Sequence, residues 1–109
     1  MKILEIRKNK KQYMELLILA DEQEDMIDKY IDRGIMFVLE DNGVKSECVV
    51  TDEGNGVLEI KNIATNPNFQ RMGYGKILIL FSIKYIVVPS IIIYHSILEN
   101  SLYFKGLCM

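Results

Sequence analysis

Residues Gln70-Arg71-Met72-Gly73-Tyr74-Gly75-Lys76 stand between an apolar segment at 57–65 and a second apolar run that begins at Ile77. These flanks predict a β-strand before the loop and a helix, 77–86, after it. The first N–H groups of a helix lack internal partners, and the helix dipole places partial positive charge there. Gly73 and Gly75 have no Cβ, so ligand oxygens can approach the main chain. The spacing therefore predicts a phosphate-binding loop, with Arg71 and Lys76 adding positive charge at its rim.

The residues upstream of this loop predict a meander of three strands. Residues 35–40 and 44–51 have strand-like composition and flank Asp41-Asn42-Gly43, which is typical of a tight hairpin turn. A second turn at 52–56 leads into the strand 57–65. Because two tight turns join the three strands, we expect them to be antiparallel neighbours.

The first 34 residues predict one strand and two helices. Residues 2–7 alternate apolar and charged side chains, which favours a short half-buried strand. A helix is expected over 11–19, and Asp21, with Glu24 in the same turn, is expected to cap a second helix that ends at Gly34. Apolar residues at helical spacing should face the core in these helices: Tyr13, Met14, Leu17, Ile18, Met26, Ile27, Tyr30 and Ile31. The whole pattern predicts an α/β (α+β) fold.

The composition describes one small globular domain, residues 1–109. The chain has 109 residues, a formal net charge of -2 and 50% hydrophobic residues, which argues against disorder. The near balance of charges gives no field that would attract nucleic acid or a membrane surface. Two distant cysteines, Cys48 and Cys108, and the single His95 predict neither a metal site nor a disulfide framework. We therefore expect no metal, no nucleic-acid partner and a reducing, cytoplasmic location.

The composition changes after residue 76. Of the 28 charged residues only three, Lys84, Glu99 and Lys105, lie in 77–109. The apolar stretch 77–98 is interrupted by Lys84 and by Pro89-Ser90, which favours buried core elements over a membrane span. The low charge and the Ile-, Ser- and Tyr-rich texture of this stretch resemble the product of a shifted reading frame.

The run Gln70-x-x-Gly73-x-Gly75 resembles the cofactor loop of the GNAT superfamily of acetyl-CoA-dependent N-acetyltransferases, which reads Gln/Arg-x-x-Gly-x-Gly/Ala. Residues 60–67 also resemble the strand before that loop in many small bacterial members. Residues 1–86 match the family pattern well, whereas 87–109 diverge from it. A nucleotide-binding P-loop would need GxxxxGK[ST], and Leu78 stands where a Rossmann loop needs Gly or Ala.

The resemblance implies a mixed, mostly antiparallel sheet, flanked by helices, that splays open at the acetyl-CoA site. Acetyl-CoA would be the cosubstrate, with its pyrophosphate on the loop and its pantetheine arm beside the strand. The implied binding residues are Ile63, Ala64 and Thr65 on the strand, and Gln70, Arg71, Met72, Gly73, Tyr74, Gly75 and Lys76 in the loop.

The resemblance also implies the chemistry, which is transfer of an acetyl group to a primary amine of a small molecule or peptide by direct attack. Glu59 lies where some members place the general base that deprotonates the amine. Tyr103 matches the tyrosine that protonates the departing thiolate, on a helix expected over 98–105. Residues 90–97 are expected to form a strand parallel to 57–65 and splayed from it.

The family's last two strands, roughly 30 residues, have no counterpart in this sequence. Without them the sheet would expose an edge, through which a homodimer is expected to form. Three hypotheses therefore stand side by side. The chain is an N-acetyltransferase, a CoA-binding protein without catalysis, or a truncated remnant without function.

Overall fold

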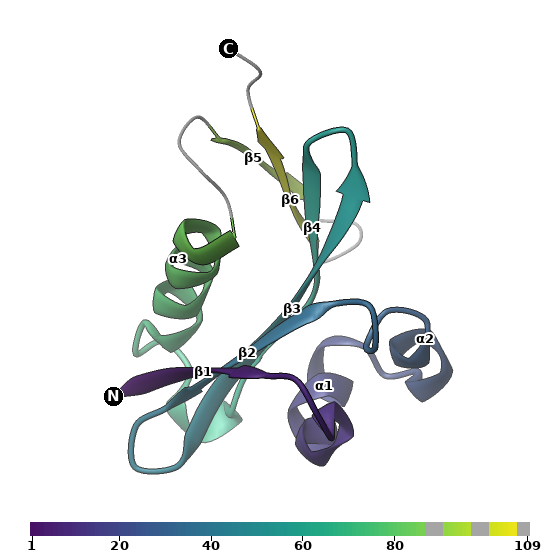
Figure 1. Ribbon diagram of the computed structural model, residues 1–109. Helices are drawn as coiled ribbons and strands as arrows, with labels where there is room; N and C mark the ends of the chain where they lie inside the picture. The colour runs from purple at the N-terminus through teal and green to yellow at the C-terminus, as the bar shows by residue number, and fades with distance from the viewer. Residues whose placement is uncertain (87–90, 97–100, 107–109) are drawn as a thin grey trace.

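A computed structural model describes residues 1–86, 91–96 and 101–106 of the chain. Six strands form one sheet in the order β1-β2-β3-β4-β6-β5, and every neighbouring pair is antiparallel (Figure 1). The strands are β1 (Lys2–Ile6), β2 (Ile35–Glu40), β3 (Val44–Gly54), β4 (Val57–Thr65), β5 (Ile91–Ser96) and β6 (Ser101–Gly106). The strand at 2–7 and the three-stranded meander are thus confirmed.

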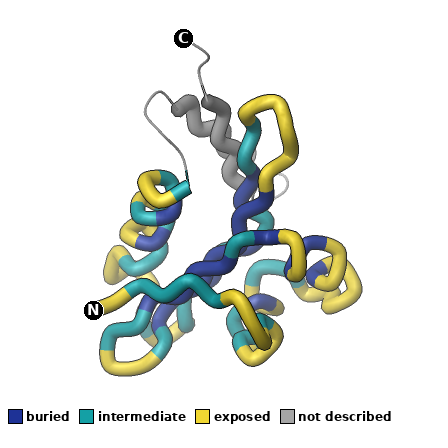
Figure 2. Tube along the Cα trace, in the orientation of Figure 1, coloured by how far each residue is buried: buried dark blue, intermediate teal, exposed yellow. Residues whose placement is uncertain are grey.

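Helices cover both faces of this sheet (Figure 1). Helix α1 (Met14–Ala20), which follows the 3₁₀ turn η1 (Lys10–Tyr13), and helix α2 (Glu24–Asp28) pack on one face. Helix α3 (Tyr74–Ile86) packs on the other face, after the short turn η2 (Pro67–Phe69). The buried residues follow β2 and β3 between these two layers (Figure 2).

Each face has its own hydrophobic cluster. On the α1/α2 face it consists of Leu17, Ile27, Tyr30, Ile31, Met36, Val38 and Val49. On the α3 face it consists of Phe37, Leu39, Cys48, Val50, Ile60 and Leu78. The rings of Phe37 and Phe81 meet edge to face, with their centroids 5.6 Å apart. Because side chains alternate along a strand, β2 supplies both clusters.

The hairpin between β2 and β3 forms as its sequence predicts. Asn42 (φ 55°) and Gly43 (φ 100°) both adopt the left-handed conformation that such a turn requires. The turn between β3 and β4 uses the same conformation at Gly54, Asn55 and Gly56. These two turns place β4 in the middle of the sheet, one strand beyond β3.

The α1/α2 segment departs from the sequence prediction in three details, the first of which is that α2 ends at Asp28 and not at Gly34. The residue that precedes α2 is Gln23, and Asp21 instead accepts hydrogen bonds from the Gln23 amide and the Tyr30 hydroxyl, at 3.3 and 3.2 Å. Ile18 and Met26 were expected in the core but are 40% and 39% exposed. The helices are too short to bury a full apolar stripe, so only part of each stripe reaches the sheet.

The C-terminal residues differ more. A strand at 90–97 is confirmed as β5, but it does not lie beside β4, because β6 lies between them. The helix expected over 98–105 is wrong for its described part, since residues 101–106 form β6. This segment contains Tyr103 and Phe104, which favour strands, and it pairs with the edge of β4 over Val57–Ile60. Residues 97–100 and 107–109 lie outside the described part of the chain.

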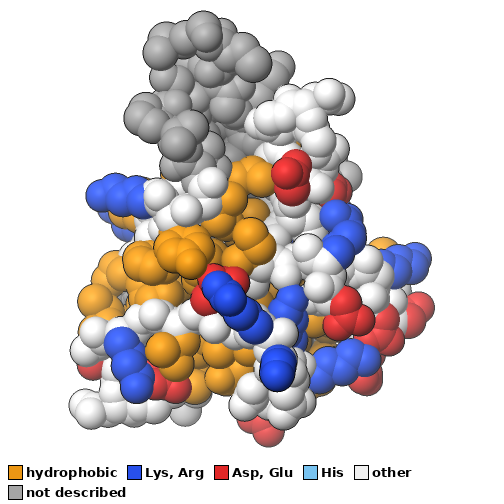
Figure 3. Space-filling view, in the orientation of Figure 1, with side chains coloured by type: hydrophobic (Ala, Val, Ile, Leu, Met, Phe, Trp, Pro, Cys, Tyr) orange, Lys and Arg blue, Asp and Glu red, His pale blue; other side chains and the backbone are white. Residues whose placement is uncertain are grey.

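Helix α3 buries one side and exposes the other. Leu78 is fully buried, whereas Ile77, Leu80 and Tyr85 are exposed. Figure 3 shows hydrophobic side chains gathered beside α3 on this face of the molecule. Within the described residues, no helix is both long and apolar enough to cross a membrane.

Candidate active site

The segment from β4 to α3 forms a tight loop that is fixed at both ends. The Asn66 amide donates to the Lys45 carbonyl oxygen at 2.8 Å, and the Asn66 side chain accepts a hydrogen bond from the Asn68 amide at 3.0 Å. At the other end the Tyr74 hydroxyl donates to the Asp41 carboxylate at 2.8 Å, and this bond raises the pKa of Tyr74. The loop is therefore held against the β2–β3 hairpin.

Two glycines give this loop its shape. Gly73 has φ +87°, and an added Cβ there would meet no atom within 4 Å, so the space before it is open. At Gly75 a Cβ would lie 3.4 Å from Thr65 Oγ1, so helix and strand approach closely. The first internal helix bond runs from the Ile77 amide to the Gly73 carbonyl at 3.0 Å. The amides of the first turn therefore face outward without helical partners.

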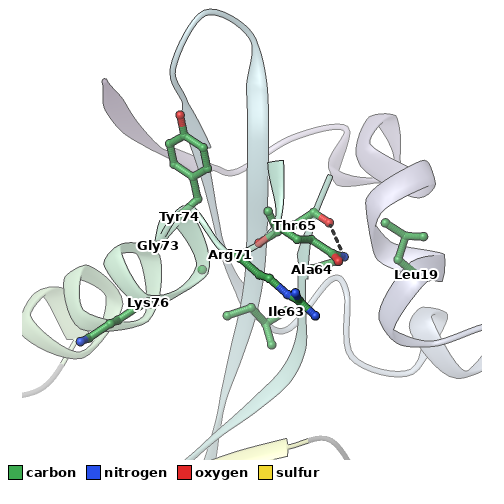
Figure 4. A pocket seen from close by; sticks show the side chains of 10 residues that line it. Leu19, Ile63, Ala64, Thr65, Arg71, Gly73, Tyr74 and Lys76 are labelled. Carbon is green, nitrogen blue, oxygen red and sulfur yellow. Dashed lines mark hydrogen bonds between the residues drawn. The ribbon is translucent and has the colours of Figure 1, made fainter. Parts of the chain in front are cut away.

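A cleft of about 450 Å³ lies in front of these amides. In Figure 4 the strand residues Ile63, Ala64 and Thr65 lie between the loop and the start of α3 on one side and Leu19 of α1 on the other. Gln70 binds the strand through a 3.4 Å hydrogen bond from its Nε2 to the Thr65 carbonyl oxygen. The remaining lining residues come from the loop and the first turn of α3: Arg71, Gly73, Tyr74, Gly75 and Lys76.

Almost every predicted binding residue thus borders one cleft. Met72 is the exception, because its side chain is 60% exposed and it does not line the cleft. Sequence reasoning missed Leu19, which lines the cleft while half-exposed. Its position outside the apolar stripe of α1 was the only available signal, and that signal does not distinguish a site residue from a surface leucine.

The edge of β4 beside the cleft is open. β6 pairs with β4 only over Val57–Ile60, so residues 61–65 have no strand partner on that side within the described chain. Main-chain groups on a free edge can hydrogen-bond an extended ligand. Together with the amides and the cations Arg71 and Lys76, this edge fits a ligand that joins phosphates to an amide-containing arm, as CoA does.

The two residues expected to act as acid and base lie at the other end of β4. Glu59 is 7% exposed, and its carboxylate forms an ion pair with Lys61 at 2.9 Å. The strand register pairs Tyr103 of β6 with Glu59, so the two positions are direct neighbours in the sheet. The structure therefore brings Glu59 and Tyr103 together, although the expected helix around Tyr103 is a strand.

The comparison with known protein families agrees with this geometry. Residues 3–88 match the family model described as Acetyltransferase (GNAT) family. This match covers most of the chain and includes the loop, β4 and both helical layers. The chain belongs to the GNAT acetyltransferase family.

Individual proteins that are similar to this chain agree with the family assignment. An uncharacterized N-acetyltransferase of Bacillus subtilis, YvbK, is 32% identical over 71 residues, which are 64% of this chain and 46% of that protein. An IAA acetyltransferase from Bacillus cereus superposes with a TM-score of 0.68 at 30% identity, over 77% of this chain and 57% of that one.

Two GNAT structures contain ligands. An acetyltransferase from Elizabethkingia anophelis with acetyl-CoA bound has a TM-score of 0.69 at 27% identity and covers 77% of this chain and 57% of that one. A Bacillus subtilis acetyltransferase in complex with CoA has a TM-score of 0.68 at 28% identity, over 77% and 56%. The chain thus spans about half the length of the relatives that it matches.

Proposed function

We propose that this chain binds acetyl-CoA in the cleft between the β4–α3 loop and α1, in the cytoplasm, and transfers the acetyl group to a primary amine. The observation that carries the proposal is the loop itself, in which outward-facing amides, Gly73, and two cations border the free edge of β4. The pyrophosphate binds at the loop and the pantetheine arm follows Ile63–Thr65 toward Glu59. The CoA-bound relatives support this choice of cosubstrate.

The transfer itself is a direct attack. Glu59 takes a proton from the acceptor ammonium, and the amine nitrogen then bonds to the thioester carbonyl carbon. The carbon–sulfur bond breaks, and the CoA thiolate takes a proton from Tyr103. The new amide nitrogen then loses its extra proton, which returns to the Tyr103 phenolate. The register that pairs Glu59 with Tyr103 supports this assignment of base and acid.

Exchange of the base tests the catalytic part of the proposal. Glu59→Gln should lower kcat by roughly 10²–10⁴-fold and leave acetyl-CoA affinity within about twofold. Glu53→Gln is the matched control, because Glu53 is the other carboxylate that binds Lys61, at 3.2 Å. Equal turnover in Glu59→Gln and the parent chain would refute the assignment. Equal losses in both variants would mean that Lys61 placement, and not a base, is responsible.

A second candidate function is CoA binding without catalysis, as a homodimer through a sheet edge. The ion pair at Glu59 favours it, because the Lys61 ammonium already occupies a carboxylate oxygen that an acceptor amine would have to contact. Tight acetyl-CoA binding with no acetyl transfer to any amine tested, in a chain that sediments as a dimer, would select this candidate.

A further inference from the structure

A second, smaller pocket of about 250 Å³ lies beside the cofactor cleft. Its inner wall contains Glu59 and Lys61, and the cleft begins two residues further along β4, at Ile63. The opposite walls are also continuous, since Leu19 borders the cleft and Asp21 borders the pocket. A thioester extending along β4 from the cleft would therefore arrive at this pocket.

The pocket carries a chain of ion pairs that fixes its charged groups. Glu59 binds Lys61 at 2.9 Å, and Lys61 binds Glu53 at 3.2 Å. Glu53 accepts two hydrogen bonds from the guanidinium of Arg33, at 2.8 and 3.5 Å. The Arg33 and Lys61 partners hold the pKa of Glu53 at about 2, so Glu53 stays charged. These linked ion pairs keep Arg33 and Lys61 in place around the pocket.

These cations have more N–H donors than their carboxylate partners use. Glu53 accepts hydrogen bonds from only the two terminal nitrogens of the Arg33 guanidinium, and its Oε1 also pairs with Lys61. Lys29 also lines the pocket, and within residues 1–86 no carboxylate lies at ion-pair distance from its ammonium, which contacts only the Met26 sulfur at 3.4 Å. The outer wall therefore offers unused cationic donors, whereas the inner wall offers the Glu59 carboxylate.

We propose that the pocket selects amino carboxylates as acetyl acceptors, an inference that rests on the proposed function. The acceptor's amine lies at Glu59, beside the thioester end of the cleft. Its carboxylate lies at Lys29 and Arg33, where a guanidinium can bind a carboxylate through two hydrogen bonds. The pocket volume limits the acceptor to a small molecule, such as a free amino acid.

Equilibrium titration of the CoA-saturated chain tests the inference without any need for turnover. The probes are L-leucine and L-leucinamide, which differ in the carboxylate. We expect leucine to bind at least about 10-fold more tightly, since a charge-assisted hydrogen bond contributes roughly that factor. Lys29→Met and Arg33→Gln should each reduce the preference toward unity. Lys84→Met, at an exposed position on α3, is the control and should keep it.

A ratio of binding constants near one in the parent chain, or a preference that both pocket variants retain, overturns the inference. Acetyl transfer is measured separately on the same two probes by mass spectrometry of the product. Transfer without carboxylate preference leaves the proposed function intact and refutes only the acceptor class. Carboxylate-dependent binding without transfer supports the pocket and refutes catalysis.

Discussion

The two faces of the sheet differ in whether their buried polar groups have hydrogen-bond partners. On the α3 face the buried polar groups bind one another, because Ser82 Oγ lies 3.2 Å from Cys48 Sγ and 2.7 Å from the Leu78 carbonyl oxygen. On the α1/α2 face the fully buried Glu47 carboxylate has no hydrogen-bond partner for either oxygen, and Asn62 Oδ1 has none. These absences refer to the residues that the structure describes.

The two faces of the sheet hold different parts of the molecule in place. The α3 face fixes the start of α3 and so the β4–α3 loop. The α1/α2 face borders the pocket at Glu59, and its polar groups reach toward that pocket through the Tyr30 hydroxyl, which Asn62 binds at 3.0 Å. Burial raises the pKa of Tyr30 to about 12, so this hydroxyl stays protonated. We expect pH to act on the second face and not on the first.

Glu47→Gln should give the largest change in the free energy of unfolding, and the size of this change should depend on pH. Burial raises the pKa of Glu47 from 4.5 to about 8, so the folded chain binds a proton that the unfolded chain releases. Its stabilising contribution is full below about pH 4.5 and disappears as pH rises through about 8. The free energy of unfolding of the parent chain should fall by about 3 to 5 kcal/mol across that window.

The measurement is urea denaturation at pH 4.5, 6.5 and 9 for both chains. The Gln variant should show a flatter pH dependence, because it cannot ionise. A variant with the same slope as the parent chain would mean that Glu47 does not titrate in this window. The two faces would then not differ in their response to pH.

Matched leucines test whether packing itself differs between the faces. Leu17 and Leu78 are both fully buried, in α1 and α3 respectively. Leu17→Ala and Leu78→Ala should each lower the free energy of unfolding by about 2–5 kcal/mol, because each leaves a cavity in a filled core. Chemical denaturation at one pH measures both. A loss below about 1 kcal/mol in either variant would show that its face is loosely packed.

Ser82→Ala should have the smallest effect. The substitution removes the hydrogen bonds to Cys48 and Leu78, which costs about 1 kcal/mol, and alanine's better helix propensity offsets part of it. Thermal unfolding should therefore shift only slightly, with no change in pH dependence. A pH-dependent effect would place a titrating group on the α3 face and contradict its assignment as the satisfied one.

Local sequence signals predicted the fold where they act over a few residues. The turn at Asn42-Gly43, the alternation in 57–65 and the glycine loop each specify their own geometry. The helix expected over 98–105 is wrong for its described part, because residues 102–105 pair with the edge of β4 over Val57–Ile60. Such a long-range pairing leaves no periodic signal in the sequence.

The site was predictable to a similar degree. The glycine motif predicted the loop, and the family resemblance implied Ile63, Ala64 and Thr65, which line the same cleft. Leu19 and the pocket cations Lys29 and Arg33 were not predicted, because they come from the α1/α2 segment, whose path over the sheet depends on tertiary packing. The pairing of Glu59 with Lys61 could have been predicted, since residues i and i+2 of a strand share a face.

Calorimetric titration with acetyl-CoA tests the central claim, that the β4–α3 loop binds the cosubstrate. Gly73→Glu and Gly54→Glu form a matched pair, because both glycines have positive φ, +87° and +85°, and neither would meet an atom within 4 Å of an added Cβ. Of these two glycines, Gly73 borders the cleft and Gly54 does not. We predict that Gly73→Glu weakens acetyl-CoA binding by at least about 100-fold, through charge repulsion with the phosphates, while Gly54→Glu binds like the parent chain. No binding by the folded parent chain, or equal binding in both variants, would contradict the account.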